Sequence, residues 1–134
     1  MRFMLLAYGN EEKFNRLSRA EMAALVEKCD VYDRELRATG KMVFGGSLDW
    51  QSKALGVKDG RAYVTDGPFV ETNEVVGGVV ILEAEDLDEA VRLASLHPAA
   101  RMGEELGWGI ELRPMGQCLL QTLVAEAARG GDTA

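Results

Sequence analysis

The chain has 134 residues, of which 47% are hydrophobic and 28% are charged, and its formal net charge is -7. This length and this balance are typical of one globular domain with its own core. The acidic charge disfavours nucleic acid and anionic membrane surfaces as partners, because binding to either depends on cationic contacts.

The apolar segments are too short to place the protein in a membrane. The longest uninterrupted run, Val75 to Leu82, is well below the roughly 20 residues of a membrane-spanning helix. The N-terminus lacks the apolar stretch and the small-residue cleavage site of a signal peptide. We therefore expect a cytoplasmic protein.

The first elements along the chain are a strand, a long helix and a second strand. The apolar run 2–8 predicts a strand buried on both faces, in the middle of a sheet. Ser18 and Glu21 have the spacing of a capping box, and an apolar stripe follows, so we predict a helix over 19–39. Gly40 suits the end of that helix. A second strand is expected over 42–46.

The second half of the chain predicts a hairpin, a strand, a helix and a last strand. Asp59-Gly60 fits a two-residue type I′ turn between strands 55–58 and 61–65. Residues 75–83 read as another buried strand, whose glycine pair at 77–78 suggests a close approach to its backbone. Asp86 is expected to cap a second helix that Pro98 ends. A last strand is expected over 108–115, where Pro114 suggests a sheet edge or the end of the strand.

This order of elements predicts an α+β, ferredoxin-like fold. The arrangement is β-α-β-(hairpin)-β-α-β, with an antiparallel sheet that carries helices on one face. We expect one domain over 1–115 and a C-terminal extension over 116–134 with a short amphipathic helix. Since two strands are apolar on both faces, the open face needs a cover. A second copy of the chain is the simplest source, so we expect a homodimer.

Several segments together resemble the YCII-related (DGPF-domain) family. The resemblance covers 1 to about 115, and it implies a dimeric α/β barrel in which two sheets pack face to face. Members of this superfamily include isomerases, dehalogenating lyases and monooxygenase-like enzymes, often without a cofactor. Some family members are encoded beside sigma factors, which leaves a regulatory role open. The segments are TDGPFVETNEVVGG at 65–78, RFMLLAYG, ELRATG, EAEDLDEA and the pair His97-Pro98.

The resemblance also implies a candidate catalytic pair. In some family members a histidine early in the first helix and an aspartate before the proline of the second helix act together. Here Glu21 stands near the first position and His97 stands at the second, so the partners would be exchanged. A carboxylate and an imidazole can serve as general acid and base. The alternatives are that Glu21 only caps its helix and that His97 lies in the last turn of its helix, facing the dipole.

The DGPF loop supplies further candidates. Asp66, Glu71 and Glu74 would raise one another's pKa values if they shared a desolvated cleft, with Phe69 directed inward. If the loop is solvated, these acids are surface charges and the motif is only a turn. Asp66 is thus a third catalytic candidate, and the other three are candidate ligand contacts.

Two residues outside that loop are candidate ligand contacts as well. Tyr8 brings a hydroxyl to the end of the first strand, and Arg101 suits a carboxylate-bearing ligand, although both can be ordinary surface residues. A metal site is not expected, because the single histidine has no partner at ligand spacing and the two cysteines are isolated. No other cofactor is expected either.

Two functions remain open at this point. The first is a cofactor-independent isomerase or lyase that uses acid–base chemistry on a small cyclic or aromatic acid. The alternative is a non-catalytic ligand-binding or regulatory dimer, with a protein partner such as a sigma factor. A shared fold does not decide between them, so whether the chain is an enzyme stays undecided from the sequence.

Overall fold

A four-stranded antiparallel sheet is the centre of the computed structural model, which describes residues 1–116 and 125–130. Each strand pairs antiparallel with its neighbours, and the order has the two most apolar strands inside, as predicted. This is the ferredoxin-like α+β arrangement expected from the order of elements. The strands across the sheet are β2 (Met42–Ser47), β5 (Val75–Glu83), β1 (Arg2–Gly9) and β6 (Gly109–Pro114).

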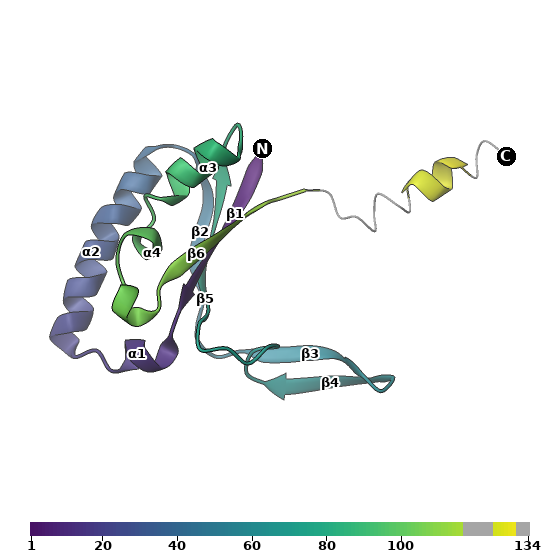
Figure 1. The fold of residues 1–134 in the computed structure, drawn as a ribbon, viewed down its shortest axis with the longest axis horizontal. Helices are drawn as coiled ribbons and strands as arrows, with labels where there is room; N and C mark the ends of the chain where they lie inside the picture. Colours follow the sequence, from purple (N-terminus) through teal and green to yellow (C-terminus); the bar gives the residue numbers. More distant parts are fainter. Residues whose placement is uncertain (117–124, 131–134) are drawn as a thin grey trace.

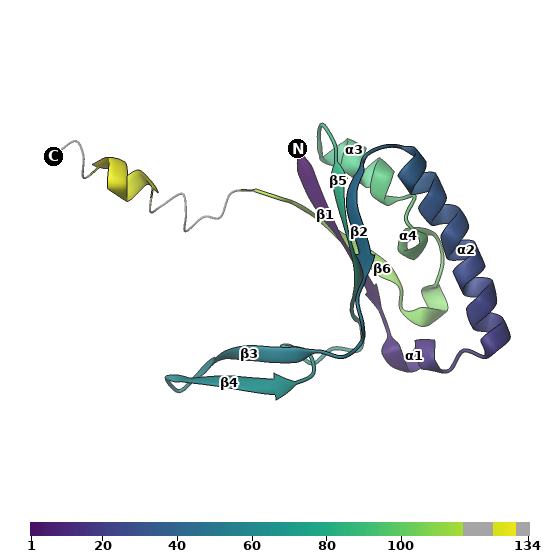
Figure 2. The same ribbon diagram turned by 180° about the vertical axis from the view of Figure 1, so that it is seen from behind.

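The helices of residues 1–116 all lie on one side of this sheet (Figures 1 and 2). The two longest were predicted from their capping signals, and the three short ones were not predicted. They are α1 (Glu11–Asn15), α2 (Arg19–Ala38), α3 (Leu87–Ala94), α4 (Pro98–Arg101) and the 3₁₀ helix η1 (Glu104–Leu106).

Local hydrogen bonds explain where the two long helices begin. The Ser18 hydroxyl accepts from the Glu21 N–H at 3.1 Å, and the Ser18 N–H donates to Glu21 Oε1 at 2.9 Å. This confirms the capping box at the start of α2. Asp86 Oδ1 accepts from the Glu89 N–H at 2.8 Å and starts α3 in the same way.

The predicted end of the second helix was wrong. Helix α3 stops at Ala94, and Pro98 is the first residue of α4 instead of the terminator of α3. His97 is therefore the N-cap of α4 and does not lie in a last helical turn. The physical reason is that proline suits the first position of a helix as well as the segment after one, because its fixed φ is helical and it needs no N–H partner there.

Strands β3 (Lys53–Lys58) and β4 (Arg61–Asp66) form a separate two-stranded ribbon. Their turn has positive φ at Asp59 (53°) and Gly60 (73°), as the predicted type I′ geometry requires. The ribbon projects from the main sheet on the side opposite to the helices (Figures 1 and 2). The sequence predicted the hairpin but not its separation from the main sheet.

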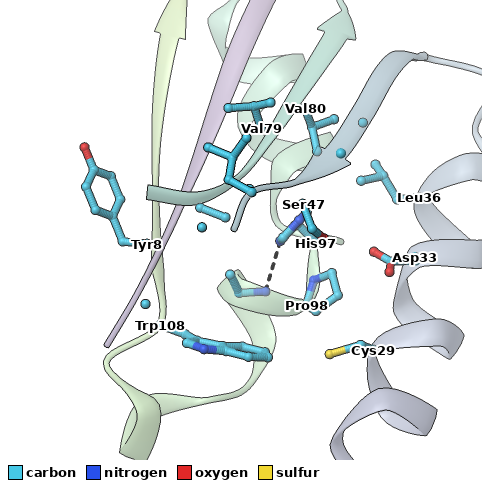
Figure 3. Close-up of a pocket in the computed structure, with 18 of the residues that line it drawn as sticks. Tyr8, Cys29, Asp33, Leu36, Ser47, Val79, Val80, His97, Pro98 and Trp108 are labelled. Carbon is cyan, nitrogen blue, oxygen red and sulfur yellow. Dashed lines mark hydrogen bonds between the residues drawn. The ribbon is translucent and has the colours of Figure 1, made fainter. Parts of the chain in front are cut away.

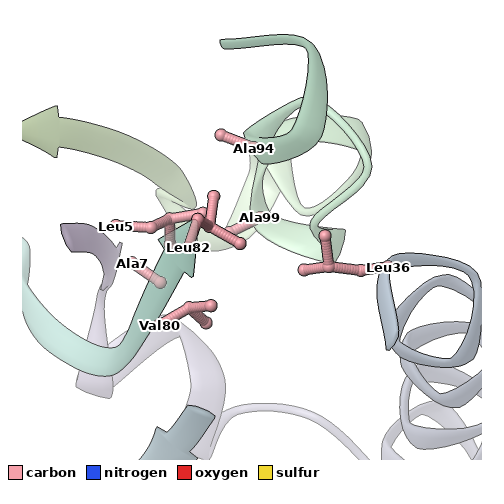
Figure 4. Packing of buried hydrophobic residues seen from close by; sticks show 7 residues of the cluster. All are labelled: Leu5, Ala7, Leu36, Val80, Leu82, Ala94 and Ala99. Atoms are coloured by element: carbon pink, nitrogen blue, oxygen red, sulfur yellow. The ribbon is translucent and has the colours of Figure 1, made fainter. Parts of the chain in front are cut away.

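The core lies between the sheet and the helices (Figure 4). Side chains alternate along β1, so Phe3 and Leu5 are fully buried while Met4 and Leu6 face the other side and are partly exposed. Figure 4 shows where strand and helix side chains meet; they are Leu5, Ala7, Val80, Leu82, Leu36, Ala94 and Ala99.

The opposite face of the sheet is apolar across β1, β5 and β2, whereas β6 places the charged residues Glu111 and Arg113 along one edge of it. Leu6 is paired with Val79 and Met4 with Ile81, so these four side chains form a continuous patch across β1 and β5. Phe44 on β2 extends it and is 53% exposed. We call this the open face. The expectation that the central strands are apolar on both sides is thus met.

The C-terminal extension is described only in part. Residues 125–130 are helical, whereas most of the predicted amphipathic helix, including residues 119–124, lies outside the described residues. No helix of the described residues is both long enough and apolar enough to cross a bilayer.

Candidate functional site

A cavity of about 440 Å³ lies between α2, one end of the main sheet and the start of α4. Its walls are mostly apolar, with a few polar groups among them, which is the usual composition of a small-molecule site. The side chains that carry chemistry there are Cys29, Asp33, Arg37 and His97, and the aromatic ones are Tyr8, Phe14, Trp50 and Trp108.

His97 enters this cavity as the N-cap of α4. Its Nδ1 accepts a hydrogen bond from the Ala99 N–H at 3.0 Å, so Nδ1 carries no proton and the neutral ring holds its proton on Nε2. Burial lowers the pKa of His97 below 6.5, and the nearby Asp33 carboxylate opposes that effect. The ring is therefore neutral near pH 7 and can donate a proton from Nε2.

Helix α2 supplies the polar wall that faces His97. Cys29, Asp33 and Arg37 are four residues apart, so they follow one face of the helix. In Figure 3, Asp33 and Cys29 extend from α2 toward the side of the cavity that holds His97, Pro98 and Trp108. Burial, and then the charge of Asp33, raise the pKa of the Cys29 thiol. Cys29 is thus a protonated thiol at neutral pH and not an activated nucleophile.

Aromatic rings and glycines shape the rest of the cavity. The Trp50 ring packs on Phe14 with 5.7 Å between ring centroids. A Cβ atom on Gly45 would lie 3.2 Å from Met42 Sδ, and one on Gly78 would lie 3.5 Å from the Gly46 carbonyl oxygen. Because glycine has no side chain, a ligand in the cavity can approach the strand backbone at these two positions.

The sequence predicted that another segment approaches the backbone at the glycine pair 77–78, and the structure shows the β2–β3 loop there. The pairing of β1 with β5 shifts at Ala7 and Tyr8, where Gly77 is the extra residue. A Cβ on Gly77 would lie 3.9 Å from the Trp50 ring, and the Gly77 carbonyl accepts from the Leu48 N–H at 2.9 Å. The glycine pair thus lets the β2–β3 loop lie against the end of β5.

Comparison with known families identifies the domain. A model of the YCII-related domain matches residues 1–106, which is most of the chain. The chain belongs to the YCII-related domain family. No curated protein matches it.

A distant similarity links the chain to solved structures. One of them is 5-chloro-2-hydroxyhydroquinone dehydrochlorinase (TftG) from Burkholderia phenoliruptrix AC1100, in a complex with 2,5-dihydroxybenzoquinone. The identity is 17%, and the alignment covers 88% of this chain and 96% of that one, with a TM-score of 0.44. This similarity is too low to support an argument about shared chemistry.

In this YCII-related domain, the two members of the predicted catalytic pair lie in different places. Glu21 is fixed in the capping box, and the hydrogen bonds from Ser18 lower its pKa. It precedes Asp33 on α2 by 12 residues, or about 18 Å at 1.5 Å per residue. The charge that the structure brings to His97 is that of Asp33, and Glu21 stays at the far end of the helix.

The two predicted ligand contacts outside the DGPF loop have other partners. The Tyr8 hydroxyl donates to Glu111 Oε2 at 2.9 Å, and this hydrogen bond raises the pKa of Tyr8. Tyr8 lines the edge of the cavity, as predicted for a ligand contact, but in Figure 3 its ring points away from His97 and Asp33. Arg101 donates to Glu35 Oε2 at 2.7 Å, and its guanidinium lies 4.2 Å from the centre of the Tyr32 ring.

The DGPF loop lies apart from His97. Asp66 forms an ion pair with Lys53 at the base of the ribbon and is well exposed. Gly67 has a φ of 97°, which confirms the predicted turn. The expectation that Phe69 is directed inward was wrong, because its side chain is 72% exposed. It lines a second, open concavity of about 660 Å³, and Leu48 and Trp50 form a wall that both concavities share. Glu71 and Glu74 are exposed.

The sequence analysis missed Asp33 and Arg37. Both follow Cys29 at intervals of four residues, so they belong to the face of α2 that the apolar stripe turns toward the sheet. The signal that could have revealed them is that these charged residues border the apolar stripe of the helix.

Within residues 1–116 and 125–130, no three histidine, cysteine or acidic side chains are close enough together to hold a metal ion.

Proposed function

We propose that this YCII-related protein is a cofactor-independent enzyme that moves protons on a small cyclic or aromatic acid, in an isomerisation or an elimination. The observation that carries the proposal is the His97 ring in the cavity, held neutral with its proton on Nε2 beside the Asp33 carboxylate. Sites that separate a carboxylate base from a neutral imidazole donor are suited to this chemistry.

The two groups have complementary roles in the reaction. Asp33 takes a proton from a carbon next to a carbonyl group, and the electron pair of that C–H bond moves toward the carbonyl oxygen. The Nε2–H of His97 donates to this oxygen and stabilises its developing negative charge. The intermediate then either regains a proton at another carbon or expels a leaving group from the adjacent carbon. Asp33 takes the place that the sequence analysis gave to Glu21 or Asp66.

Arg37 is the group we assign to the acid function of the substrate. It lines the cavity, and in the described part of the chain it has no carboxylate within ion-pairing distance. Its guanidinium can bind a carboxylate through two parallel hydrogen bonds. Arg101, the sequence candidate for this role, is already paired with Glu35.

The test uses hydrogen exchange, because the proposed chemistry begins with proton removal. Carboxylated cyclic ketones and hydroxylated aromatic acids are incubated with the protein in D₂O, and deuterium incorporation and product signals are followed by proton NMR. We expect exchange or turnover of one compound class with the native protein. Asp33→Asn and His97→Asn should each lower the rate by about 10²-fold or more.

His97→Asn is chosen because asparagine is a good N-cap whose oxygen can still accept from the Ala99 N–H. Loss of activity in this variant then reports the loss of the imidazole and not of the helix cap. Glu21→Gln and Asp66→Asn test the competing assignment: if they lower the rate and Asp33→Asn does not, the proposed roles are wrong. Compounds that bind the cavity without exchange or turnover would favour the non-catalytic ligand-binding role.

We also propose that the protein is a homodimer, in which the open faces of two sheets pack together. The support is the apolar patch of Met4, Leu6, Val79 and Ile81, which lies opposite to the helices. An apolar surface of this extent is uncommon on a monomer in water. Sedimentation equilibrium measures the assembly directly, and a monomer at all accessible concentrations would overturn this part of the proposal.

A further inference from the structure

The β3–β4 ribbon carries an apolar face that nothing in the described chain covers. Leu55 lies opposite Val64 and Val57 opposite Ala62, so these four side chains share one face of the ribbon. The exposed fractions of Leu55, Val57 and Val64 are 67%, 73% and 64%. We call this surface the ribbon face. Within the described residues, β3 and β4 pair only with each other, and an isolated two-stranded ribbon is marginal in water.

The ribbon and the open face border the same space. Figure 2 shows the ribbon standing out on the side of the sheet that carries no labelled helix. Its strands have six residues each, so the ribbon reaches about 20 Å at about 3.4 Å per residue. Two sheets packed face to face are only about 10 Å apart. A second copy placed on the open face would therefore be overlapped by this ribbon.

The areas also favour contact with the second copy. The open face of the main sheet measures about 20 Å by 25 Å, or about 500 Å², which is below the roughly 800 Å² per partner of a stable interface. One ribbon face adds about 200 Å². In a symmetric dimer each copy gives one ribbon and receives one, so the total reaches about 900 Å² on each copy.

The charges point to the same partner. Residues 53–66 hold three basic and two acidic residues, a formal charge of +1, whereas the chain as a whole carries -7. The rest of the chain therefore carries -8. Because the Lys53–Asp66 pair is at the base, the tip holds Lys58, Asp59 and Arg61. A ribbon with a basic tip is attracted to the acidic body of another copy.

We infer that the ribbon is an arm that crosses to the second copy and packs its ribbon face against that copy. The inference rests on the homodimer proposed above, and it adds the segment that holds the two copies together. It also gives the DGPF turn a structural task, since Gly67 and Pro68 set the direction in which the chain leaves β4 at the base of the arm.

Nuclear Overhauser effects between differently labelled copies test the arm directly. Protein with ¹³C-labelled Leu and Val methyl groups in a deuterated background is mixed with unlabelled protein, and only contacts between copies are recorded. We expect such contacts from the methyl groups of Leu55, Val57 and Val64. If the protein is a dimer and these methyl groups contact only their own chain, the arm is overturned and the dimer stands.

Two matched double variants test the energetic role of the arm. Val57→Thr with Val64→Thr keeps the shape of the ribbon face and makes it polar. Val26→Thr with Val31→Thr makes the same change at valines of α2 that are each 60% exposed. We expect the dimer dissociation constant to rise about tenfold or more in the ribbon variant only. Equal effects of the two variants would overturn the arm.

The outcomes separate this inference from the proposed function. A native protein that is a monomer overturns the arm and the dimer together, without bearing on proton transfer in the cavity. Conversely, the deuterium-exchange measurement of the proposed enzyme does not depend on whether the ribbon crosses.

Discussion

At the scale of single residues, the helix cap and burial both favour the neutral form of His97. As an N-cap it accepts the Ala99 N–H through Nδ1, and this requires an unprotonated ring. Burial acts in the same direction and lowers its pKa. A cationic His97 would lose the cap and would carry a charge into a mostly apolar cavity. The fold therefore holds this histidine neutral.

This leads to a pH dependence with a definite sign. Because the pKa of His97 is lower in the folded protein than its unfolded value of 6.5, the unfolded state binds the proton more tightly. The free energy of unfolding should thus fall as the pH is lowered from about 6.5 toward the folded-state pKa, and it should be insensitive to this group above about pH 7.

Urea unfolding of the native protein and of His97→Asn between pH 5 and pH 8 measures the effect. The native protein should lose stability more steeply than the variant on the acidic side of this range, since the variant keeps the cap and cannot titrate. Parallel stability curves for the two proteins would show that His97 is not held neutral by the fold.

The sequence revealed only part of the candidate site. His97 was found because it is the single histidine in the chain. Its neighbour Asp33 was missed because the sequence around it has no feature that distinguishes it from the other acidic residues of the long helix. Which turn of α2 lies beside α4 depends on the packing of Leu36 against Ala94 and Ala99, a contact between distant parts of the chain.

At the scale of elements, α2 begins at a capping box that also contains Glu21, a catalytic candidate of the sequence analysis. The structure shows Glu21 in its capping bonds with Ser18, at the end of α2 away from Asp33. We therefore expect Glu21→Ala to lower the free energy of unfolding slightly, because it removes one of the two hydrogen bonds of the capping box. Ligand binding and exchange in the cavity should stay unchanged at temperatures where the variant is folded.

Glu27→Ala is the control for this measurement, since Glu27 is an exposed acid in the interior of the same helix. Urea unfolding and the deuterium-exchange assay are run on both variants. A Glu21→Ala protein with native stability and a large loss of exchange would assign Glu21 to the chemistry and not to the cap.

Elements with local signals were predicted well, and those that depend on context were not. N-terminal helix caps and the Asp59-Gly60 turn lie within a few residues of the structure they cause, so both long helices and the hairpin were found. Pro98 has two opposite uses at helix ends, and only the packing of α4 decides between them. Nothing local in β3 and β4 encodes the angle at which the ribbon leaves the main sheet.

At the scale of the whole molecule, the strand order follows from burial. The most apolar strands, β1 and β5, take the interior positions of the sheet. There the amphipathic helices cover one of their faces, and the other face is open to a partner. This other face also has apolar side chains, because successive apolar residues of β1 point alternately to the two faces. The same strand pattern therefore accounts for the core and supports the proposed interface between two copies.

Leu6→Glu tests that interface at its centre. Leu6 lies on the open face, between Val79 and Glu111 on the neighbouring strands. In a single copy this position is partly exposed, so the charge should change the free energy of unfolding only slightly. In a face-to-face dimer two unpaired carboxylates would be buried close together, which costs several kcal/mol, so the dissociation constant should rise by about 10²-fold or more.

Sedimentation equilibrium of the native protein and of Leu6→Glu reads out this effect, with circular dichroism to verify the fold. Val31→Glu places the same charge on the outer side of α2 and should leave the dimer intact. If Leu6→Glu remains as dimeric as the native protein, the two sheets do not pack on each other through β1. The ribbon would then join the copies in some other arrangement, with the open faces apart.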